Sequence, residues 1–159
     1  MILLTGCAGF IGMHCAQALL AQGEQVVGID NLNAYYDVAL KEARLERLRA
    51  HPDFAFERMD VADRAAMAAL FARVRPARVL HLAAQAGVRY SIDAPDEYTD
   101  ANLLGFANVL QGCRTQQVRT WCSPARPAST AATPACLTAS ATRWTTPSAT
   151  TPPPRRPTR

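Results

Sequence analysis

Three glycines near the start of the chain, Gly6, Gly9 and Gly12, have the spacing of a phosphate-binding turn. Glycine permits a tight turn and leaves no side chain between the backbone amides and a ligand. The apolar run 2–5 precedes these glycines and a helical pattern follows them, which is the context in which such a triplet holds a dinucleotide at a helix N-terminus. A glycine-rich turn that holds no ligand is the alternative interpretation.

An acidic residue, Asp30, ends the second apolar run 24 residues after Gly6. In dinucleotide-binding folds an acid near this spacing accepts hydrogen bonds from the adenosine ribose hydroxyls. A carboxylate at this place favours NAD over NADP, because it repels a 2′-phosphate. The alternative is a carboxylate that merely ends a strand in a turn.

Alternating apolar runs and helical patterns must position these residues. We predict strands over residues 2–5, 25–30, 54–59 and 78–82, and helices over 11–22, 37–49, 63–74 and 98–113. Such β-α-β units have right-handed crossovers and build a parallel sheet, here the doubly wound α/β (Rossmann) class. Gly6, Asp30, Asp60 and Ala83 then all lie at the carboxyl ends of strands, where open α/β sheets bind ligands.

The helical periodicity also predicts which side chains are buried. The predicted buried faces are Ile11, Cys15, Ala18 and Leu19 on the first helix, and Leu103, Phe106, Ala107 and Leu110 on the last. The charges of helix 37–49 are interpreted as a solvated face and not as a binding patch. We expect Asn102 to tie its helix to a neighbouring loop, and His81 to pack within its strand instead of acting in catalysis.

The composition excludes several classes of protein. No apolar run approaches the roughly 18 residues of a membrane span, and no basic region precedes the first apolar run as in a secretory signal. The five cysteines and three histidines are scattered without the spacing of a disulfide framework or a zinc site, so we expect no metal and a cytoplasmic location. Residues 1–119 hold 12 basic and 13 acidic residues, whereas residues 120–159 hold five arginines and no acid.

Residues 1–119 resemble the extended short-chain dehydrogenase/reductase family, the NAD-dependent epimerases and dehydratases. TGCAGFIG is similar to the TGxxGFIG loop of that family, HLAAQAGVR to its segment after the fourth strand, and TDANLLGFANVLQGC to its helix with a core asparagine. DNLNAYYDVALKEARLERL and AGVRYS resemble, more specifically, the nucleotide-sugar epimerases of the UDP-glucuronate 4-epimerase type.

The resemblance implies bound NAD, a UDP-sugar substrate, a homodimer, and reversible hydride transfer at C4 of the sugar. It also implies the cofactor-binding residues Gly6, Gly9, Phe10, Ile11, Gly12, Asp30, Asn31, Asp60, Val61, Leu82, Ala83, Ala84, Gln85 and Asn102, with Arg89 near the substrate. In such enzymes a tyrosine removes the proton of the C4 hydroxyl, and a lysine four residues later lowers the pKa of that tyrosine.

Residues 120–159 differ sharply from the preceding domain and no longer resemble the family. They contain eight of the eleven prolines, ten threonines and a single leucine, so they bury too little apolar surface to fold. We therefore predict an incomplete NAD-binding Rossmann domain over residues 1–119 and a non-native, disordered tail over 120–159. Without a fifth strand the predicted order is 3-2-1-4, with the fourth strand as an exposed edge.

A shift of the reading frame near Arg119 explains this tail. If one nucleotide is missing, the Trp121 and Cys122 codons restore a valine, and the Trp144 and Thr145 codons restore an aspartate. Permissible codons across the tail also restore a serine run and a Tyr-x-x-x-Lys pattern. As written, the chain has no tyrosine after Tyr98 and no lysine after Lys41, so we expect no catalytic residue and no activity.

Several alternatives remain open at this point. A frameshift in the determined sequence implies a full-length epimerase, whereas a genomic one implies an inactive NAD-binding fragment or pseudogene product. A natural Pro/Thr-rich linker is the alternative origin of the tail. A relative of the nucleotide-sugar 4,6-dehydratases is another possible function. Binding of nucleic acid by the tail arginines is disfavoured, because only five arginines lie there, among prolines.

Overall fold

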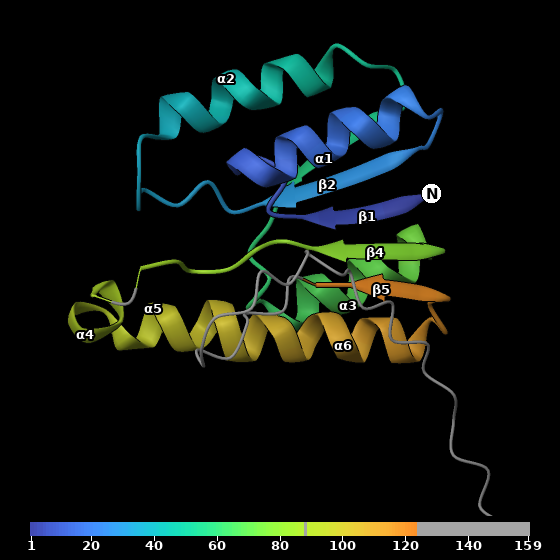
Figure 1. The fold of residues 1–159 in the computed structure, drawn as a ribbon. Helices are drawn as coiled ribbons and strands as arrows, with labels where there is room; N and C mark the ends of the chain where they lie inside the picture. Colours follow the sequence, from blue (N-terminus) through green and yellow to red (C-terminus); the bar gives the residue numbers. More distant parts are fainter. Residues whose placement is uncertain (88, 124–159) are drawn as a thin grey trace, which may run out of the picture.

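A computed structural model of the 159-residue chain describes residues 1–87 and 89–123. Five parallel strands form one sheet in the order β3-β2-β1-β4-β5 (Figure 1). The strands are β1 (Ile2–Thr5), β2 (Val26–Asp30), β3 (Phe54–Arg58), β4 (Arg78–His81) and β5 (Thr120–Cys122). The predicted α/β class and the first four predicted strands are confirmed.

Helices cover both faces of the sheet. They are α1 (Phe10–Ala21), α2 (Val38–Arg49), α3 (Arg64–Val74), α4 (Tyr90–Asp93), α5 (Pro95–Thr99) and α6 (Gly105–Thr115), with a π-helical turn η1 (Asp100–Leu104) between the last two. Figure 1 shows α1 and α2 on one face and α3 and α6 on the other, with the carboxyl ends of all strands pointing to the left. This two-sided cover agrees with the doubly wound prediction.

Two aspartates set the starts of α2 and α3. The Asp37 carboxylate accepts a hydrogen bond from the Ala39 amide at 2.8 Å, and the Asp63 carboxylate accepts one from the Ala66 amide at 2.9 Å. Such N-caps satisfy backbone donors that have no partner within the helix. Both helices therefore begin one residue after the acid that the sequence placed at their start.

The core lies in two layers on either side of β1, which is buried along its whole length. Leu4 packs in the cluster beneath α1 and α2, and Leu3 packs in the cluster beneath α3 and α6. Alternate side chains of a strand point to opposite faces, so a strand buried on both faces is continuously apolar. This explains why β1 could be recognised as a buried parallel strand.

The predicted buried face of α1 is wrong. The structure buries Gly12, Met13, Ala16 and Leu20, whereas Ile11 is 64% exposed and Ala18 is exposed as well. A Cβ atom on Gly12 would lie 2.0 Å from the Gly6 carbonyl oxygen, so the helix contacts the glycine turn through its smallest residue. Apolar periodicity cannot reveal a face whose first member has no side chain.

The last predicted helix is also oriented differently from the prediction. Its buried residues are Gly105, Asn108, Val109 and Gly112, while Leu103 is 67% exposed and Ala107 is exposed. Cβ atoms at Gly105 and Gly112 would lie 2.6 Å from Val61 and 2.4 Å from Phe71. Because two glycines allow this close approach, the buried face is narrower and less apolar than the pattern suggested.

The predicted exposed edge at β4 is wrong, because β5 pairs with it in parallel. Thr120 lies opposite Arg78, and Cys122 lies opposite Leu80. A strand ladder is made by backbone groups and therefore forms with side chains foreign to the family. The Trp121 ring packs edge-on against Phe106 at 5.6 Å between centroids, but its buried indole N–H has no hydrogen-bond partner within the described residues.

The predictions for the tail beyond Ser123 lie outside the described residues. Within the described part of the chain, no helix is long and apolar enough to cross a membrane.

Candidate functional site

A cavity of about 170 Å³ lies at the carboxyl ends of the central strands. Four chain segments meet there: the glycine turn after β1, the β2 end with its following loop, the β3 end, and the segment after β4. The lining residues are Gly6, Gly9, Ile29, Asp30, Asn31, Asn33, Tyr35, Tyr36, Lys41, Met59, Asp60, Val61, Leu82, Ala83, Ala84, Gln85, Ala86 and Ala101. The sheet edge that the sequence predicted is thus hollowed.

The glycine turn brings bare backbone to this cavity. Gly6 has φ +72°, and a Cβ atom on it would lie 2.7 Å from the Ala83 amide nitrogen. The first hydrogen bond of α1 runs from the Met13 amide to the Gly9 carbonyl at 3.0 Å. Helix geometry therefore leaves the preceding amides of the first turn free for an anion.

Two carboxylates are fixed at the β2 and β3 ends. The Asp30 oxygens accept the Ala8 amide at 3.1 Å and the Leu32 amide at 2.9 Å. The Asp60 carboxylate accepts the Asn31 side-chain amide at 2.9 Å. Each carboxylate oxygen can accept a second hydrogen bond, so both groups are oriented and still able to bind hydroxyl or amino groups.

A buried hydroxyl holds the segment after β4. Thr5 Oγ1 accepts the Leu82 amide at 3.2 Å and the Ala83 amide at 3.0 Å, and lies 2.7 Å from His81 Nδ1. Because the two amides use its acceptor capacity, the Thr5 hydroxyl donates to Nδ1, which places the histidine proton on Nε2. Burial lowers the pKa of His81 to about 4. The histidine thus packs as a neutral acceptor, as the sequence predicted.

This histidine predicts a pH dependence of stability. Its folded pKa of about 4 lies below the ordinary 6.5, so the unfolded chain binds more protons between these values. Protonation therefore favours unfolding as the pH falls, and we expect the free energy of unfolding to drop by roughly 3 kcal/mol between pH 6.5 and 4. Urea unfolding across this range measures it. His81→Asn keeps an acceptor for Thr5 and should flatten this part of the profile; an unchanged slope would contradict the assignment.

Further hydrogen bonds fix Gln85 over the cavity. Its amide donates to Asn102 Oδ1 at 2.9 Å, and its carbonyl accepts Asn102 Nδ2 at 3.0 Å. Its side chain accepts the Asn33 amide group at 3.1 Å. The prediction that Asn102 ties its helix to a loop is confirmed, and the β2 loop reaches the β4 segment across the cavity.

The structure places most of the predicted site residues together. The cavity is lined by Gly6, Gly9, Asp30, Asn31, Asp60, Val61, Leu82, Ala83, Ala84 and Gln85. Phe10, Ile11, Gly12, Asn102 and Arg89 do not line it: Gly12 is buried behind the turn, Phe10 and Ile11 are 64% exposed, and Arg89 is exposed at the start of α4.

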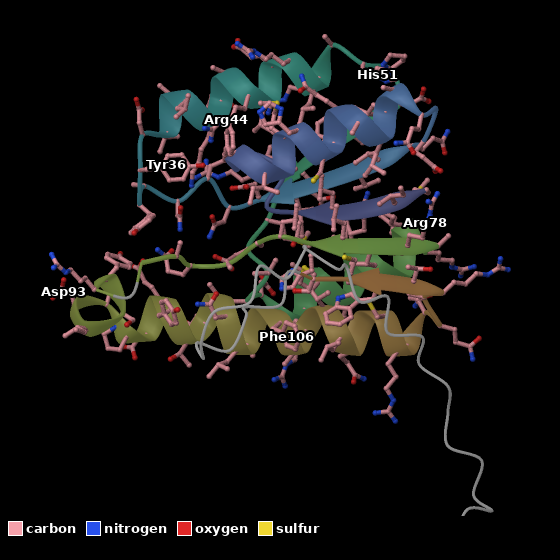
Figure 2. All side chains as sticks on the ribbon, in the orientation of Figure 1. Tyr36, Arg44, His51, Arg78, Asp93 and Phe106 are labelled. Carbon is pink, nitrogen blue, oxygen red and sulfur yellow. The ribbon has the colours of Figure 1, made fainter. Side chains whose placement is uncertain are left out.

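Sequence reasoning missed the contribution of the segment after β2. Tyr35, Tyr36 and Lys41 line the cavity, and Lys41 is only 4% exposed although helix 37–49 was interpreted as carrying a solvated charged face. Figure 2 shows Tyr36 and Arg44 at the same side of the molecule as the carboxyl ends of the strands. A lysine among polar neighbours gives no periodic signal for burial; only its chain proximity to Asp30 pointed to the site.

The part of the chain described by the structure holds no group of three His, Cys, Asp or Glu side chains that could bind a metal ion. Cys7, Cys15, Cys113 and Cys122 are free thiols.

Comparison with known proteins places this site in a family. The model of the GDP-mannose 4,6 dehydratase family matches residues 3–132, which is most of the chain. The chain belongs to the GDP-mannose 4,6 dehydratase family. This membership, with its Rossmann sheet and glycine turn, confirms the resemblance to NAD-dependent epimerases and dehydratases.

Relatives within this dehydratase family point to nucleotide-sugar epimerases. The chain is 45% identical over 114 residues to UDP-glucuronate 4-epimerase 3 of Arabidopsis thaliana, covering 72% of this chain and 26% of that protein. It is 53% identical over 117 residues to an uncharacterized 37.6 kDa protein of Escherichia coli O111:H-, covering 74% and 35%. The chain therefore spans about a third, or less, of the length of the curated relatives it matches.

Solved structures of dehydratase-family relatives agree. UDP-glucuronic acid 4-epimerase from Bacillus cereus, in complex with UDP-glucuronic acid and NAD, matches with TM-score 0.65 and 35% identity, covering 71% of this chain and 36% of that one. UDP-glucose 4-epimerase of Thermus thermophilus, in complex with NAD, matches with TM-score 0.63 and 37% identity, covering 76% and 35%.

Proposed function

We propose that this chain is the NAD-binding part of a nucleotide-sugar 4-epimerase that interconverts UDP-glucuronate and UDP-galacturonate. The observation that carries the proposal is the convergence of the glycine turn, Asp30 and Asp60 on one cavity at the carboxyl edge of the sheet. The similarity to UDP-glucuronate 4-epimerases supports the choice of sugar nucleotide.

The site fits the cofactor by its shape and donor set. A side chain at Gly6 would collide with backbone, so a pyrophosphate can approach the turn and the amides of Phe10 and Ile11 closely. Asp30 and Asn31 are placed to meet the adenosine ribose, and Asp60 with Val61 the adenine. We assign Leu82, Ala83, Ala84 and Gln85 to the nicotinamide side, Gly9 and Gly12 to the turn, Asn102 to positioning Gln85, and Arg89 to the sugar nucleotide.

When bound, NAD supplies a hydride acceptor for C4 of the sugar. The residues described here bind and orient the cofactor, but the C4 hydroxyl must also lose its proton to a base for hydride to leave. The 159 residues contain no tyrosine after Tyr98 and no lysine after Lys41, so the Tyr-x-x-x-Lys pattern is absent. We infer that the chain as written binds cofactor without turnover, and that a shifted reading frame removed the base.

Binding of NAD by the 159-residue chain tests the proposal. Calorimetric titration should show saturable binding, and Asp30→Asn should weaken it by about tenfold or more, since hydrogen bonds to a charged acceptor are among the stronger ones. Asp53→Asn is the matched control, because Asp53 is exposed next to the amino end of β3, away from the cavity. A folded chain that does not bind NAD at millimolar concentration would sink the proposal.

A 4,6-dehydratase is the second candidate, favoured by the description of the matching family model. A protein with the reading frame restored decides between them: an epimerase inverts C4 of the sugar, whereas a dehydratase releases water and leaves a 4-keto-6-deoxy sugar. The inactive fragment, the homodimer and the cytoplasmic location stay predictions.

A further inference from the structure

Lys41 is buried at the cavity although its helix faces solvent on most of its surface. It is 4% exposed, and its Nζ donates to the Asn33 carbonyl at 2.8 Å and to Asn33 Oδ1 at 2.6 Å. The same Nζ lies 4.4 Å from the centre of the Tyr36 ring. Lysine is almost never fully buried unless it is paired, so this position needs a reason.

The hydrogen-bonding capacity of this ammonium is not used up. A lysine ammonium has three N–H donors, and Asn33 accepts two of them. The contact with the Tyr36 ring is electrostatic and requires no N–H of its own. One donor is therefore left for the cavity that Lys41 lines.

Asp30 and Lys41 face this cavity together without forming an ion pair within the described residues. Burial lowers the pKa of Lys41, the nearby Asp30 carboxylate raises it, and Arg44 lowers it again, so the two opposite charges are neighbours. Each Asp30 oxygen already accepts one backbone amide and keeps one free lone pair. A ligand group that accepts from Lys41 and donates to Asp30 would satisfy both, and a hydroxyl does this.

We propose that Lys41 is a second ribose-recognition residue, whose free N–H donates to an adenosine ribose hydroxyl that in turn donates to Asp30. The inference rests on the proposed function, because it requires NAD in this cavity. It explains why a lysine is buried beside an acid without pairing with it: the hydroxyl completes the bridge.

Asn33 acts as a positioning residue in this arrangement. Its side-chain oxygen accepts from Lys41, while its side-chain amide donates to Gln85 Oε1 at 3.1 Å. The two contacts fix the direction of Lys41 and join the β2 loop to the segment after β4. A ribose held by Lys41 would therefore be registered against both sides of the cavity.

The test combines one substitution with one change in the ligand. Lys41→Met keeps the apolar stem and removes the ammonium; Arg47→Met, on the exposed face of the same helix, is the matched control. Calorimetry is run with NAD and with its 2′-deoxy and 3′-deoxy adenosine-ribose analogues. Lys41→Met should weaken NAD binding by roughly 10- to 100-fold, as expected for a charged donor. It should have little further effect on the analogue that lacks the bridging hydroxyl.

Equal weakening of all three ligands would show that Lys41 only supports the loop, and no weakening would exclude any role; both overturn the proposal. If the wild-type chain binds no NAD at all, the proposed function itself fails, which is a different result. Should Lys41→Met not fold, the wild-type chain still decides. Lys41 is its only lysine, so saturating NAD should slow acetylation of this amine relative to the N-terminal amine, and unchanged acetylation would refute the bridge.

Discussion

Gly12→Ala should lower the free energy of unfolding by about 3 kcal/mol or more and abolish NAD binding. The added Cβ would lie 2.0 Å from the Gly6 carbonyl oxygen and 3.0 Å from the Cys7 Cα. These are backbone atoms, so no side chain can rotate away, and α1 must move off the turn. Because domains of this size are stable by only about 5–15 kcal/mol, the loss is a large fraction of the total. Urea unfolding followed by circular dichroism measures it.

Gly23→Ala is the matched control for this substitution. Gly23 ends α1 with φ +77°, and no heavy atom lies within 4 Å of the position of its Cβ. Its replacement costs only the left-handed backbone strain, about 1–2 kcal/mol, and should leave NAD binding intact. If Gly12→Ala unfolded at the same urea concentration as Gly23→Ala and still bound NAD, the close packing of α1 against the turn would be refuted.

Restoring the reading frame should convert a chain without turnover into an epimerase. One inserted nucleotide between the codons of Val118 and Trp121 would restore a serine run and the Tyr-x-x-x-Lys pattern. A positioned general base contributes about 10²–10⁴-fold to such a rate, and cofactor and base must act together. Chromatographic detection of UDP-galacturonate formed from UDP-glucuronate measures the gain.

The control for this experiment is the restored frame with its tyrosine codon changed to phenylalanine, which should bind NAD but not turn over. Turnover by the 159-residue chain would contradict the assignment of the base to the missing segment. A restored protein that binds NAD and both sugar nucleotides but forms no product would contradict the frameshift.

The sheet and most of the site were predictable because they depend on short-range patterns. Continuous apolar runs marked the first four strands, and the position of an acid directly after a strand was enough to place Asp30 and Asp60 at the same edge. Parallel topology did the rest, since carboxyl ends of parallel strands converge.

The helix faces, the fifth strand and Lys41 were not predictable in the same way. In α6 the contact surface consists of Gly105 and Gly112, whose packing depends on what lies opposite, namely Val61 and Phe71. The pairing of β5 depends on backbone position and not on side chains, so an unfamiliar sequence concealed it. The burial of Lys41 depends on Asn33 and Tyr36, which belong to the preceding loop.

The Thr5 hydroxyl has a consequence for the entropy of binding. By accepting the Leu82 and Ala83 amides, it makes the first residues beyond β4 an extension of the sheet, and Asn102 fixes Gln85 from the other side. A ligand that reaches this wall finds it already ordered, so little backbone freedom is lost there on association. Whatever ordering the ligand must bring about then falls on the opposite wall, in the loop between β2 and α2.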